Sequence, residues 1–305
     1  MSVRVTRVFS IAVMGALAVG CGASRQAVWD DDPAEGTGGA QTQESRSQRQ
    51  TLIDEGEAAW QQRGDEAQIR ACIDKWRRAA DADPSDHALW VRLARAYYFL
   101  ADGHLSFDEA RAEEMIETYE SGTEAAERAL VALSPDFAQR MRAGTRIEEA
   151  VAVLDAQAVP ALYWRSSNMG KWGIAKGFAT ILAYKDEIRA IMARCLELDA
   201  SYFYAGPHRY FGVFYAKVPA FAGGDLERSN EHFQQAIAAA PTYLATRSLY
   251  AEYFAQKSQN RALFEEQLNL VINADADAEP EVAPENHIEQ RRARELMARA
   301  DDLFE

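Results

Sequence analysis

Apolar and small residues recur along most of this chain at helical spacing. Two stretches share the order small residue, aromatic, alanine, proline, with spacings of four, three and five: Cys72, Trp76, Ala79, Pro84 and Ser229, Phe233, Ala236, Pro241. Positions i, i+4 and i+7 lie on one face of an α-helix, so each set predicts a packing stripe. The proline then ends one helix and begins the next. The pattern predicts an all-α protein made of helical hairpins.

Repetition of such a unit every few tens of residues is typical of a helical solenoid of the tetratricopeptide type. We expect one folded domain over residues 51–305, with five helix pairs at 52–81, 86–133, 161–198, 204–239 and 242–273. Ile147, Val151 and Leu154 are at helical spacing and predict one extra amphipathic helix between the second and third pairs. After a linker, residues 287–304 are expected to form a helix whose polar face caps the solenoid.

The first twenty residues indicate export. Arg4 and Arg7 precede an apolar run over residues 8–19 that is too short to span a bilayer comfortably. Residues 17–21, Leu-Ala-Val-Gly-Cys, resemble a bacterial lipobox, with Ala18 where leucine is commonest. We therefore expect residues 1–20 to be a lipoprotein signal peptide and Cys21 to be lipidated. A plain signal peptide cut near the same place is the alternative.

Residues 21–50 are rich in glycine, alanine, glutamine, serine and acidic residues, with Trp29 and Val28 as the large apolar side chains. This composition buries too little surface to offset the entropy of ordering, so we expect a flexible tether. The lipid would be the only attachment to the membrane. Gly22, where aspartate would favour the inner membrane, favours anchorage in the outer membrane, on its periplasmic face.

The charge of the chain narrows the class of partner. Its net charge is −14, and loss of Arg4 and Arg7 with the signal peptide makes it −16. Such an acidic surface repels phosphates, so we expect no nucleic-acid partner. Cys72 and Cys195 each lie on an apolar stripe and are expected to be small buried side chains, with a disulfide between them as the alternative.

No catalytic motif is present in the sequence. It lacks the serine-hydrolase elbow, the zinc-protease helix and the Walker loop, and its five histidines form no ligand pair on one helix. Gly223-Gly224-Asp225 resembles an anion-binding turn, but the aspartate at the helix start places negative charge where an anion would lie. We expect a non-enzymatic protein without cofactor or metal.

One span differs from an ordinary solenoid core. Residues 162–215 hold twelve aromatic side chains interleaved with cations, and Gly170, Gly173 and Gly177 allow close approach of a backbone or a ligand. Ordinary packing between repeats explains many of these aromatics. A cleft for a small ligand is the other interpretation, with candidate lining residues Trp164, Arg165, Lys171, Trp172, Tyr204, Arg209, Tyr210 and Tyr215. Arg165, Lys171 and Arg209 are the candidates to bind a carboxylate.

Several blocks follow the order found in one protein family: residues 161–164, 171–173, 196–199, 204–207, 209–212, 219–225, 233–237 and 249–253. On these blocks the chain resembles the TatT component of TRAP transporters, lipid-anchored tetratricopeptide-like proteins of the bacterial periplasm. The resemblance covers about residues 50–273 and is strongest from residue 160 onward.

The resemblance implies a non-enzymatic accessory subunit of a tripartite, ion-driven secondary transporter. Such a subunit docks the periplasmic solute-binding protein, self-associates into a homo-oligomer and helps to handle an apolar or carboxylate ligand. The alternative is a general tetratricopeptide scaffold lipoprotein that organises envelope proteins and binds peptides along its concave face.

Overall fold

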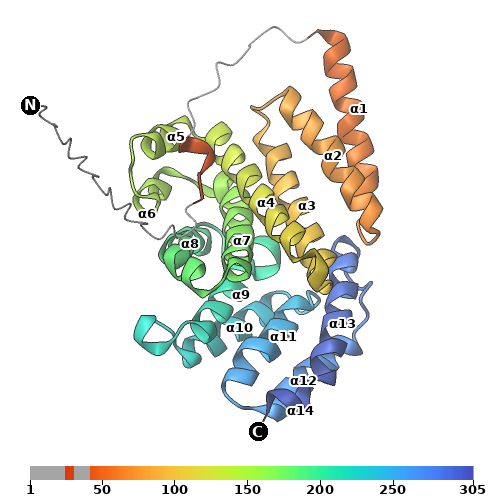
Figure 1. Cartoon of the computed structure of the whole chain (residues 1–305), viewed down its shortest axis with the longest axis vertical. Helices are drawn as coiled ribbons and strands as arrows, with labels where there is room; N and C mark the ends of the chain where they lie inside the picture. Colours follow the sequence, from red (N-terminus) through yellow and green to blue (C-terminus); the bar gives the residue numbers. More distant parts are fainter. Residues whose placement is uncertain (1–24, 31–41, 305) are drawn as a thin grey trace, which may run out of the picture.

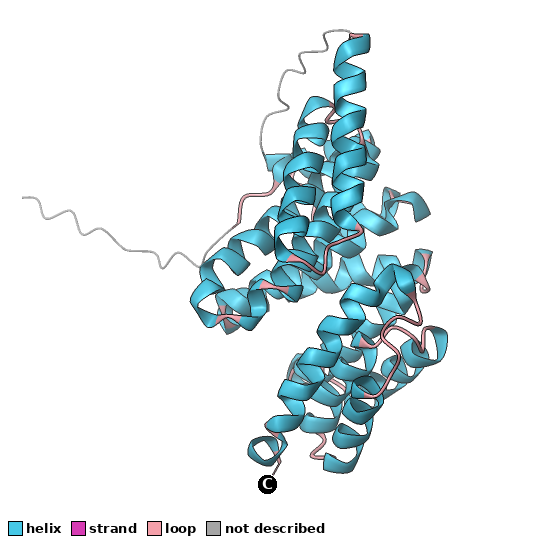
Figure 2. Ribbon diagram, turned by 90° about the vertical axis from the view of Figure 1, so that its right-hand side faces the viewer, coloured by secondary structure: helices cyan, strands magenta, loops and turns pink. Residues whose placement is uncertain are grey.

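A computed structural model of the chain describes residues 25–30 and 42–304. Over these residues the chain forms helices joined by short loops, and no strand (Figures 1 and 2). The helices of the first half are α1 (Gln43–Trp60), α2 (Glu66–Ala82), α3 (His87–Gly103), α4 (Ala112–Leu133), α5 (Pro135–Arg142), α6 (Ile147–Ala150) and α7 (Val159–Lys176). Those of the second half are α8 (Phe178–Leu198), α9 (Tyr202–Lys217), α10 (Leu226–Ala239), α11 (Ala245–Leu249), α12 (Arg261–Ile272), α13 (Ala283–Ala298) and α14 (Ala300–Leu303).

Consecutive long helices pack in pairs: α1 on α2, α3 on α4, α7 on α8 and α9 on α10. The prediction of an all-α fold made of helical hairpins is therefore confirmed. A π-helical segment (Tyr250–Ala255) continues α11 and packs on α12. The C-terminal helix α13 contacts both α12 and α3 (Figure 1). It therefore joins the C-terminal hairpins to the N-terminal ones, in addition to covering the last hairpin.

Aspartates define where several helices begin. The Asp65 carboxylate accepts a hydrogen bond from Ala67 N at 2.7 Å at the start of α2. Asp225 does the same for Glu227 N at 3.0 Å at the start of α10, after a 3₁₀ turn (Ala220–Ala222). These side chains satisfy amide groups that have no partner inside the helix. The Gly-Gly-Asp block is thus a turn followed by a capped helix, as its aspartate predicted.

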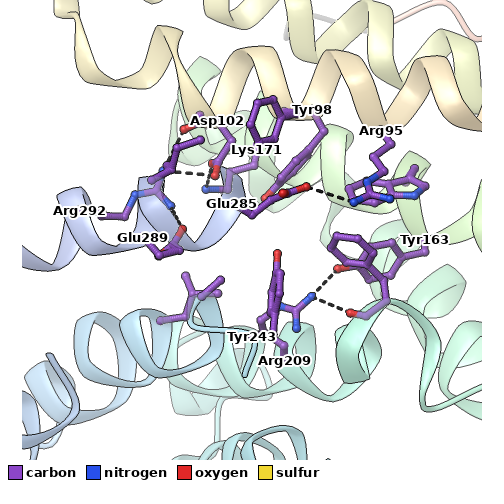
Figure 3. Close-up of a pocket in the computed structure, with 17 residues that line it drawn as sticks. Arg95, Tyr98, Asp102, Tyr163, Lys171, Arg209, Tyr243, Glu285, Glu289 and Arg292 are labelled. Atoms are coloured by element: carbon purple, nitrogen blue, oxygen red, sulfur yellow. Dashed lines mark hydrogen bonds and ion pairs between the residues drawn. The ribbon is translucent and has the colours of Figure 1, made fainter. Parts of the chain in front are cut away.

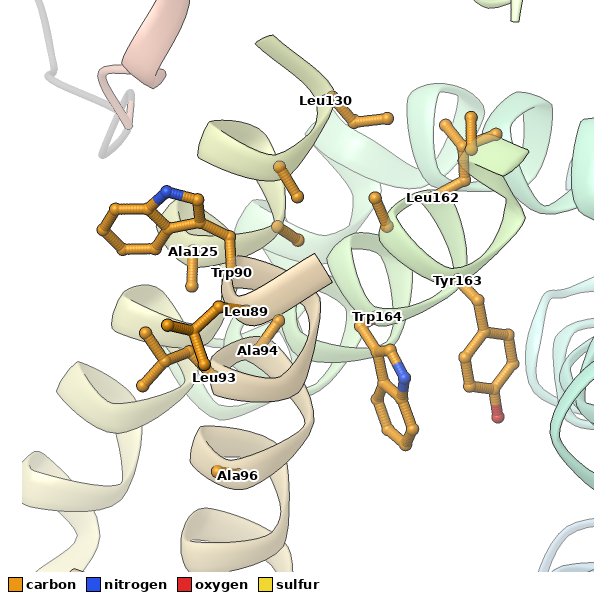
Figure 4. Close-up of a cluster of buried hydrophobic side chains, with 14 of the residues drawn as sticks. Leu89, Trp90, Leu93, Ala94, Ala96, Ala125, Leu130, Leu162, Tyr163 and Trp164 are labelled. Carbon is orange, nitrogen blue, oxygen red and sulfur yellow. The ribbon is translucent and has the colours of Figure 1, made fainter. Parts of the chain in front are cut away.

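The largest part of the core lies where α3, α4 and α7 meet (Figure 4). Leu93, Leu130 and Leu162 are completely buried there. A Cβ atom on Gly122 of α4 would lie 2.3 Å from the Asn168 side-chain oxygen, so this glycine allows α4 and α7 to approach closely. This tight packing makes a rigid wall for the cavity described below.

The structure differs from the predicted tether over residues 21–50 at two places. First, α1 begins at Gln43 because Thr42 caps it, accepting from Ser45 N at 3.1 Å. Arg49 of this helix is anchored by the Ala79 carbonyl oxygen at 2.9 Å.

Second, residues 25–30 lie on the folded body. Trp29 is buried and its ring meets Phe137 edge-on at 5.6 Å. The Arg25 guanidinium donates two hydrogen bonds to Glu127, at 2.7 and 2.9 Å. Ordering this segment costs conformational entropy, and its composition suggested that too little apolar surface is buried to offset that cost. The buried ion pair and the aromatic contact of Trp29 provide the missing stabilisation. The predicted signal peptide, Cys21 and residues 31–41 lie outside the described residues.

Residues 134–158 form two short helices and 3₁₀ turns instead of one amphipathic helix. Gly144 has a positive φ of 77° and follows the end of α5, which stops the helix. The three apolar positions that predicted the helix, Ile147, Val151 and Leu154, are nevertheless buried. The burial of these three side chains was therefore predicted correctly, whereas the prediction of a single amphipathic helix was wrong.

Both cysteines in the described residues are free thiols and completely buried. Cys72 lies in α2 and Cys195 in α8. The interpretation as small buried side chains is confirmed, and the alternative of a disulfide is wrong.

Candidate functional site

A cavity of about 80 Å³ lies between α3, α7, α9, α11 and α13 (Figure 3). Helix α3 contributes Arg95, Tyr98 and Asp102, which are three and seven residues apart and so share one face. Helix α13 contributes a second set at helical spacing: Glu285, Glu289 and Arg292. The cavity therefore depends on two helices that are almost two hundred residues apart in the sequence.

One end of the cavity holds an ion-pair network around Asp102. Lys171 Nζ lies 2.5 Å from one carboxylate oxygen of Asp102, and an Arg292 nitrogen lies 3.2 Å from the other. Burial raises the pKa of Asp102, but Arg292 and Lys171 outweigh this effect and hold it well below its usual range. Arg292 also pairs with Glu289 at 2.7 Å. The charges at this end of the cavity are therefore paired with one another, and one oxygen of Glu289, Oε2, is buried without a hydrogen-bond partner.

The other end is built by a short left-handed turn at the start of α9. Phe203, Tyr204 and Ala205 have φ values of 46°, 57° and 56°. Left-handed backbone costs about 1–2 kcal/mol for each non-glycine residue, so this turn stores about 3–6 kcal/mol. Right-handed helix follows from Gly206, where an added Cβ atom would lie 2.4 Å from a ring carbon of Tyr163.

Arg209 stabilises this turn from inside. Its guanidinium donates to the Tyr204 and Phe203 carbonyl oxygens at 2.9 and 3.2 Å. It also donates to the Tyr163 hydroxyl at 2.9 Å and the Thr246 hydroxyl at 3.4 Å. The strained carbonyls and the guanidinium therefore hold one another in place, next to the cavity that Arg209 lines.

Arg209 differs from the other cations of the cavity in its electrostatic partners. Arg95 pairs with Glu285 at 3.1 Å, whereas no carboxylate in the described residues lies within ion-pair distance of Arg209. The cavity has four cations, Arg95, Lys171, Arg209 and Arg292, against three carboxylates, Asp102, Glu285 and Glu289. Arg209 is 5% exposed, so its charge is both buried and formally uncompensated. Such a group is unfavourable unless an anion joins it.

Aromatic rings form the walls around Arg209. Its guanidinium carbon lies 4.5 Å from the ring centre of Tyr243, a cation–π contact. Tyr163 and Trp164 contact each other edge-on at 5.0 Å, and Phe203 meets Trp164 at 4.7 Å. The site thus combines aromatic walls with a cation that has no carboxylate partner among the described residues, which suits a small anion that has an apolar part.

The structure brings three of the predicted site residues to this cavity: Trp164, Lys171 and Arg209. Tyr204 adjoins it, with its ring stacked on Tyr243 at 5.1 Å and its carbonyl oxygen on Arg209. Arg165 and Trp172 point elsewhere. Arg165 is buried in a separate cluster with Glu127 and Glu187, and Trp172 packs on Tyr184.

The two remaining predicted residues also lie away from the cavity. Tyr210 lines a second, apolar groove of about 230 Å³ between α7, α8 and α9. Tyr215 packs on His232, which faces His208 across α9 and α10 with their Nδ1 atoms 3.0 Å apart. This histidine pair is formed by two helices, so histidine spacing along a single helix does not reveal it. No group of three metal-ligating side chains occurs in the described residues.

Sequence reasoning missed the cavity residues of α3 and α13. The available signal was charge at helical spacing: Arg95 and Asp102 interrupt the apolar face of α3, and Glu289 and Arg292 share a face of α13. A charged residue on a face that must pack requires a partner, so these positions were informative.

Over the described residues, no helix is both long and apolar enough to span a membrane. A family model described as the TRAP transporter T-component matches residues 76–304. This range includes both helices that supply the ion-pair network and the left-handed turn with Arg209. No curated protein matches the chain.

Proposed function

The chain belongs to the TRAP transporter T-component family, and on that premise we propose that it is a non-enzymatic, lipid-anchored accessory subunit in the periplasm. It docks the solute-binding protein of its transporter and holds a small carboxylate in the cavity beside Arg209. The observation that carries the ligand proposal is the buried Arg209 guanidinium, which has no carboxylate partner among the described residues and lines the cavity.

A carboxylate is the anion that fits best. Its negative charge pairs with the buried charge of Arg209, whose terminal N–H groups already donate to the left-handed turn, Tyr163 and Thr246. The aromatic walls accept its carbon chain. The volume of about 80 Å³ limits the ligand to a handful of non-hydrogen atoms. Because Lys171 and Arg292 are already paired with carboxylates, the ligand binds at the Arg209 end.

Thermal unfolding of the mature full-length chain with a series of two- to six-carbon mono- and dicarboxylates tests the ligand proposal. At a hundredfold excess over Kd, a ligand stabilises by about 2.7 kcal/mol, which raises Tm by about 5 °C in a chain of this size. Arg209→Gln is expected to weaken binding at least 30-fold, because it removes the buried charge that pairs with the ligand. Arg209→Lys keeps the charge and is expected to retain part of the effect.

Arg142→Gln is the matched control, because Arg142 is an exposed arginine at the end of α5, outside the cavity. Its Tm shift should equal that of the wild type. If no carboxylate in the series stabilises the wild type, the ligand proposal is wrong. The same holds if Arg209→Gln and Arg209→Lys both fold and respond as the wild type does.

Docking of a solute-binding protein is supported by the family match, which covers three quarters of the chain. The general scaffold lipoprotein has the same fold and differs in its partners. A scaffold captures peptides or envelope proteins, whereas the accessory subunit binds a solute receptor, so identification of the partner separates the two functions.

A further inference from the structure

Exposed apolar side chains gather around the groove between α7, α8 and α9. Phe178 is 70% exposed, and Ile174 and Leu182 are also exposed; all three line the groove. Phe221, 93% exposed, stands on the 3₁₀ turn directly after Pro219, which lines the groove as well. Two phenylalanines this exposed are unusual on a protein surface that water alone covers.

The charge around this groove is opposite to that of the whole chain. Lys185 and Lys217 line it, and exposed Lys176 lies in sequence between Ile174 and Phe178. Of these, Lys185 is paired with Asp186 at 2.7 Å. Lysines beside exposed phenylalanines, in a protein of net charge −14, form the surface that an anionic lipid headgroup layer attracts.

The docked N-terminal segment places this surface close to the predicted lipid. The Arg25 amide donates to the Tyr184 hydroxyl at 2.9 Å, and Tyr184 lies in α8 between Leu182 and Lys185. Cys21 precedes Arg25 by four residues, which span at most about 14 Å. A free tether through residue 50 would instead have an average reach of about 30 Å.

The segment cannot detach easily from the body. Glu127, which holds Arg25 and accepts from Val28 N at 3.1 Å, is fully buried and shared with Arg165. Figure 1 shows α8 and the teal α9–α10 connector on the side of the molecule where residues 25–30 lie. In this view, residues 25–30 thus lie on the same side as the helix and the connector that carry Phe178 and Phe221.

We propose that this surface, Ile174, Phe178, Leu182 and Phe221 with the three lysines, lies on the lipid bilayer and fixes the orientation of the body on the membrane. The phenylalanines enter the boundary between headgroups and acyl chains, and the lysines contact anionic headgroups. The proposal rests on lipidation of Cys21, which is part of the proposed function. The cavity at Arg209 then keeps one defined direction relative to the membrane.

Single cysteines at Phe178 and Phe221 test this surface, each labelled with an environment-sensitive fluorophore. Leu270→Cys on α12 is the matched control, since Leu270 is an exposed apolar residue away from the groove. The native thiols Cys72 and Cys195 are buried, and the unsubstituted chain measures any background labelling. The mature chain is reconstituted into vesicles of phosphatidylethanolamine and phosphatidylglycerol that carry a nitroxide on the acyl chains.

We expect blue-shifted emission, quenched by the nitroxide, at positions 178 and 221, and unshifted, unquenched emission at 270. Leu182→Cys replaces either position if that variant fails to fold. Unquenched probes at positions 178 and 221 would overturn the proposal. A blue shift in the absence of vesicles would also overturn it, because protein and not lipid then covers the surface. Mass spectrometry of the N-terminal peptide separates the proposed lipid anchor from the proposed membrane-lying surface. If Cys21 carries acyl chains and the probes remain unquenched, only the membrane-lying surface is refuted. Absence of acyl chains refutes the anchor and this inference together.

Discussion

Replacing Gly206 with alanine tests the close contact on which the Arg209 site depends. The new Cβ atom would lie 2.4–2.7 Å from three atoms of Tyr163, including its hydroxyl oxygen. This ring has little freedom to move, because it contacts three neighbouring rings at 5.0–5.7 Å: Trp164, Tyr202 and Phe203. The backbone at Gly206 is not in the positive-φ region, so the expected effect comes from the clash alone.

The magnitude follows from three contributions. Overpacking in a close-packed interior costs about 1–3 kcal/mol. Displacement of Tyr163 also loses its hydrogen bond from Arg209, and a hydrogen bond to a charged group contributes about 1.5–3 kcal/mol. Alanine in a helix recovers up to about 1 kcal/mol relative to glycine. With the full recovery subtracted, we therefore expect Gly206→Ala to lower the free energy of unfolding by about 1.5–5 kcal/mol.

Gly170→Ala is the matched control, because an added Cβ atom at Gly170 meets no atom within 4 Å and the residue lies inside α7. This variant should gain about 0.5–1 kcal/mol from helix propensity. Urea unfolding followed by circular dichroism measures both free energies. Equal stability of the two variants, with unchanged m-values, would show that Tyr163 and the left-handed turn are not packed as described.

Three further predictions concern other parts of the molecule. Glu127→Gln removes the carboxylate shared by two buried arginines and should lower the free energy of unfolding by about 3–5 kcal/mol. Residues 25–30 should also be cleaved faster by a protease. Unchanged stability and unchanged cleavage would refute the role of this ion pair. Burial lowers the pKa of His208, and burial with His208 and Arg228 lowers that of His232 to about 4. Because the unfolded chain binds protons on these histidines more readily, the free energy of unfolding is highest above pH 6.5 and falls as the pH falls toward 4. A His208→Gln/His232→Gln variant should show a smaller fall over this range. A fall equal to that of the wild type would contradict the burial of the neutral histidine pair. Burial also raises the pKa of both buried thiols well above its usual value, so they should not react with an aromatic disulfide reagent until the protein unfolds.

The repeat pattern was sufficient to predict the hairpins. Trp76 and Phe233 occupy equivalent positions of the pattern, and both are buried, at 2% and 0% exposure. Such stripes are local, because positions i, i+4 and i+7 share a face whatever the rest of the chain does. The aspartate caps were predictable for the same reason.

The cavity was only partly predictable because its charges are paired across the whole chain. Arg165 and Arg209 look alike in the sequence, and the structure pairs the first with Glu127 and Glu187 but gives the second no carboxylate among the described residues. Arg292 lies in the helix whose polar face was predicted to cap the solenoid, and it pairs with Asp102, 190 residues away. Charges at helical spacing show that a partner is needed without showing which one.

The left-handed turn had no recognisable sequence signal. Phe203, Tyr204 and Ala205 lack the glycine or asparagine that usually marks positive φ. The conformation is stabilised by hydrogen bonds from Arg209, and these depend on the packing of α7 against α9. Tertiary contacts therefore override the local preference at the position that builds the site.

Affinity capture with the mature, lipidated chain from a periplasmic extract, with the captured proteins quantified by mass spectrometry, tests the proposed function most directly. The Glu127→Gln variant and an empty resin provide the comparisons for damaged and absent bait. The accessory-subunit function predicts an extracytoplasmic solute-binding protein as the dominant captured protein, confirmed by binding of the purified pair. Recovery of envelope-assembly or cell-wall proteins without any solute receptor would contradict it and favour the general scaffold.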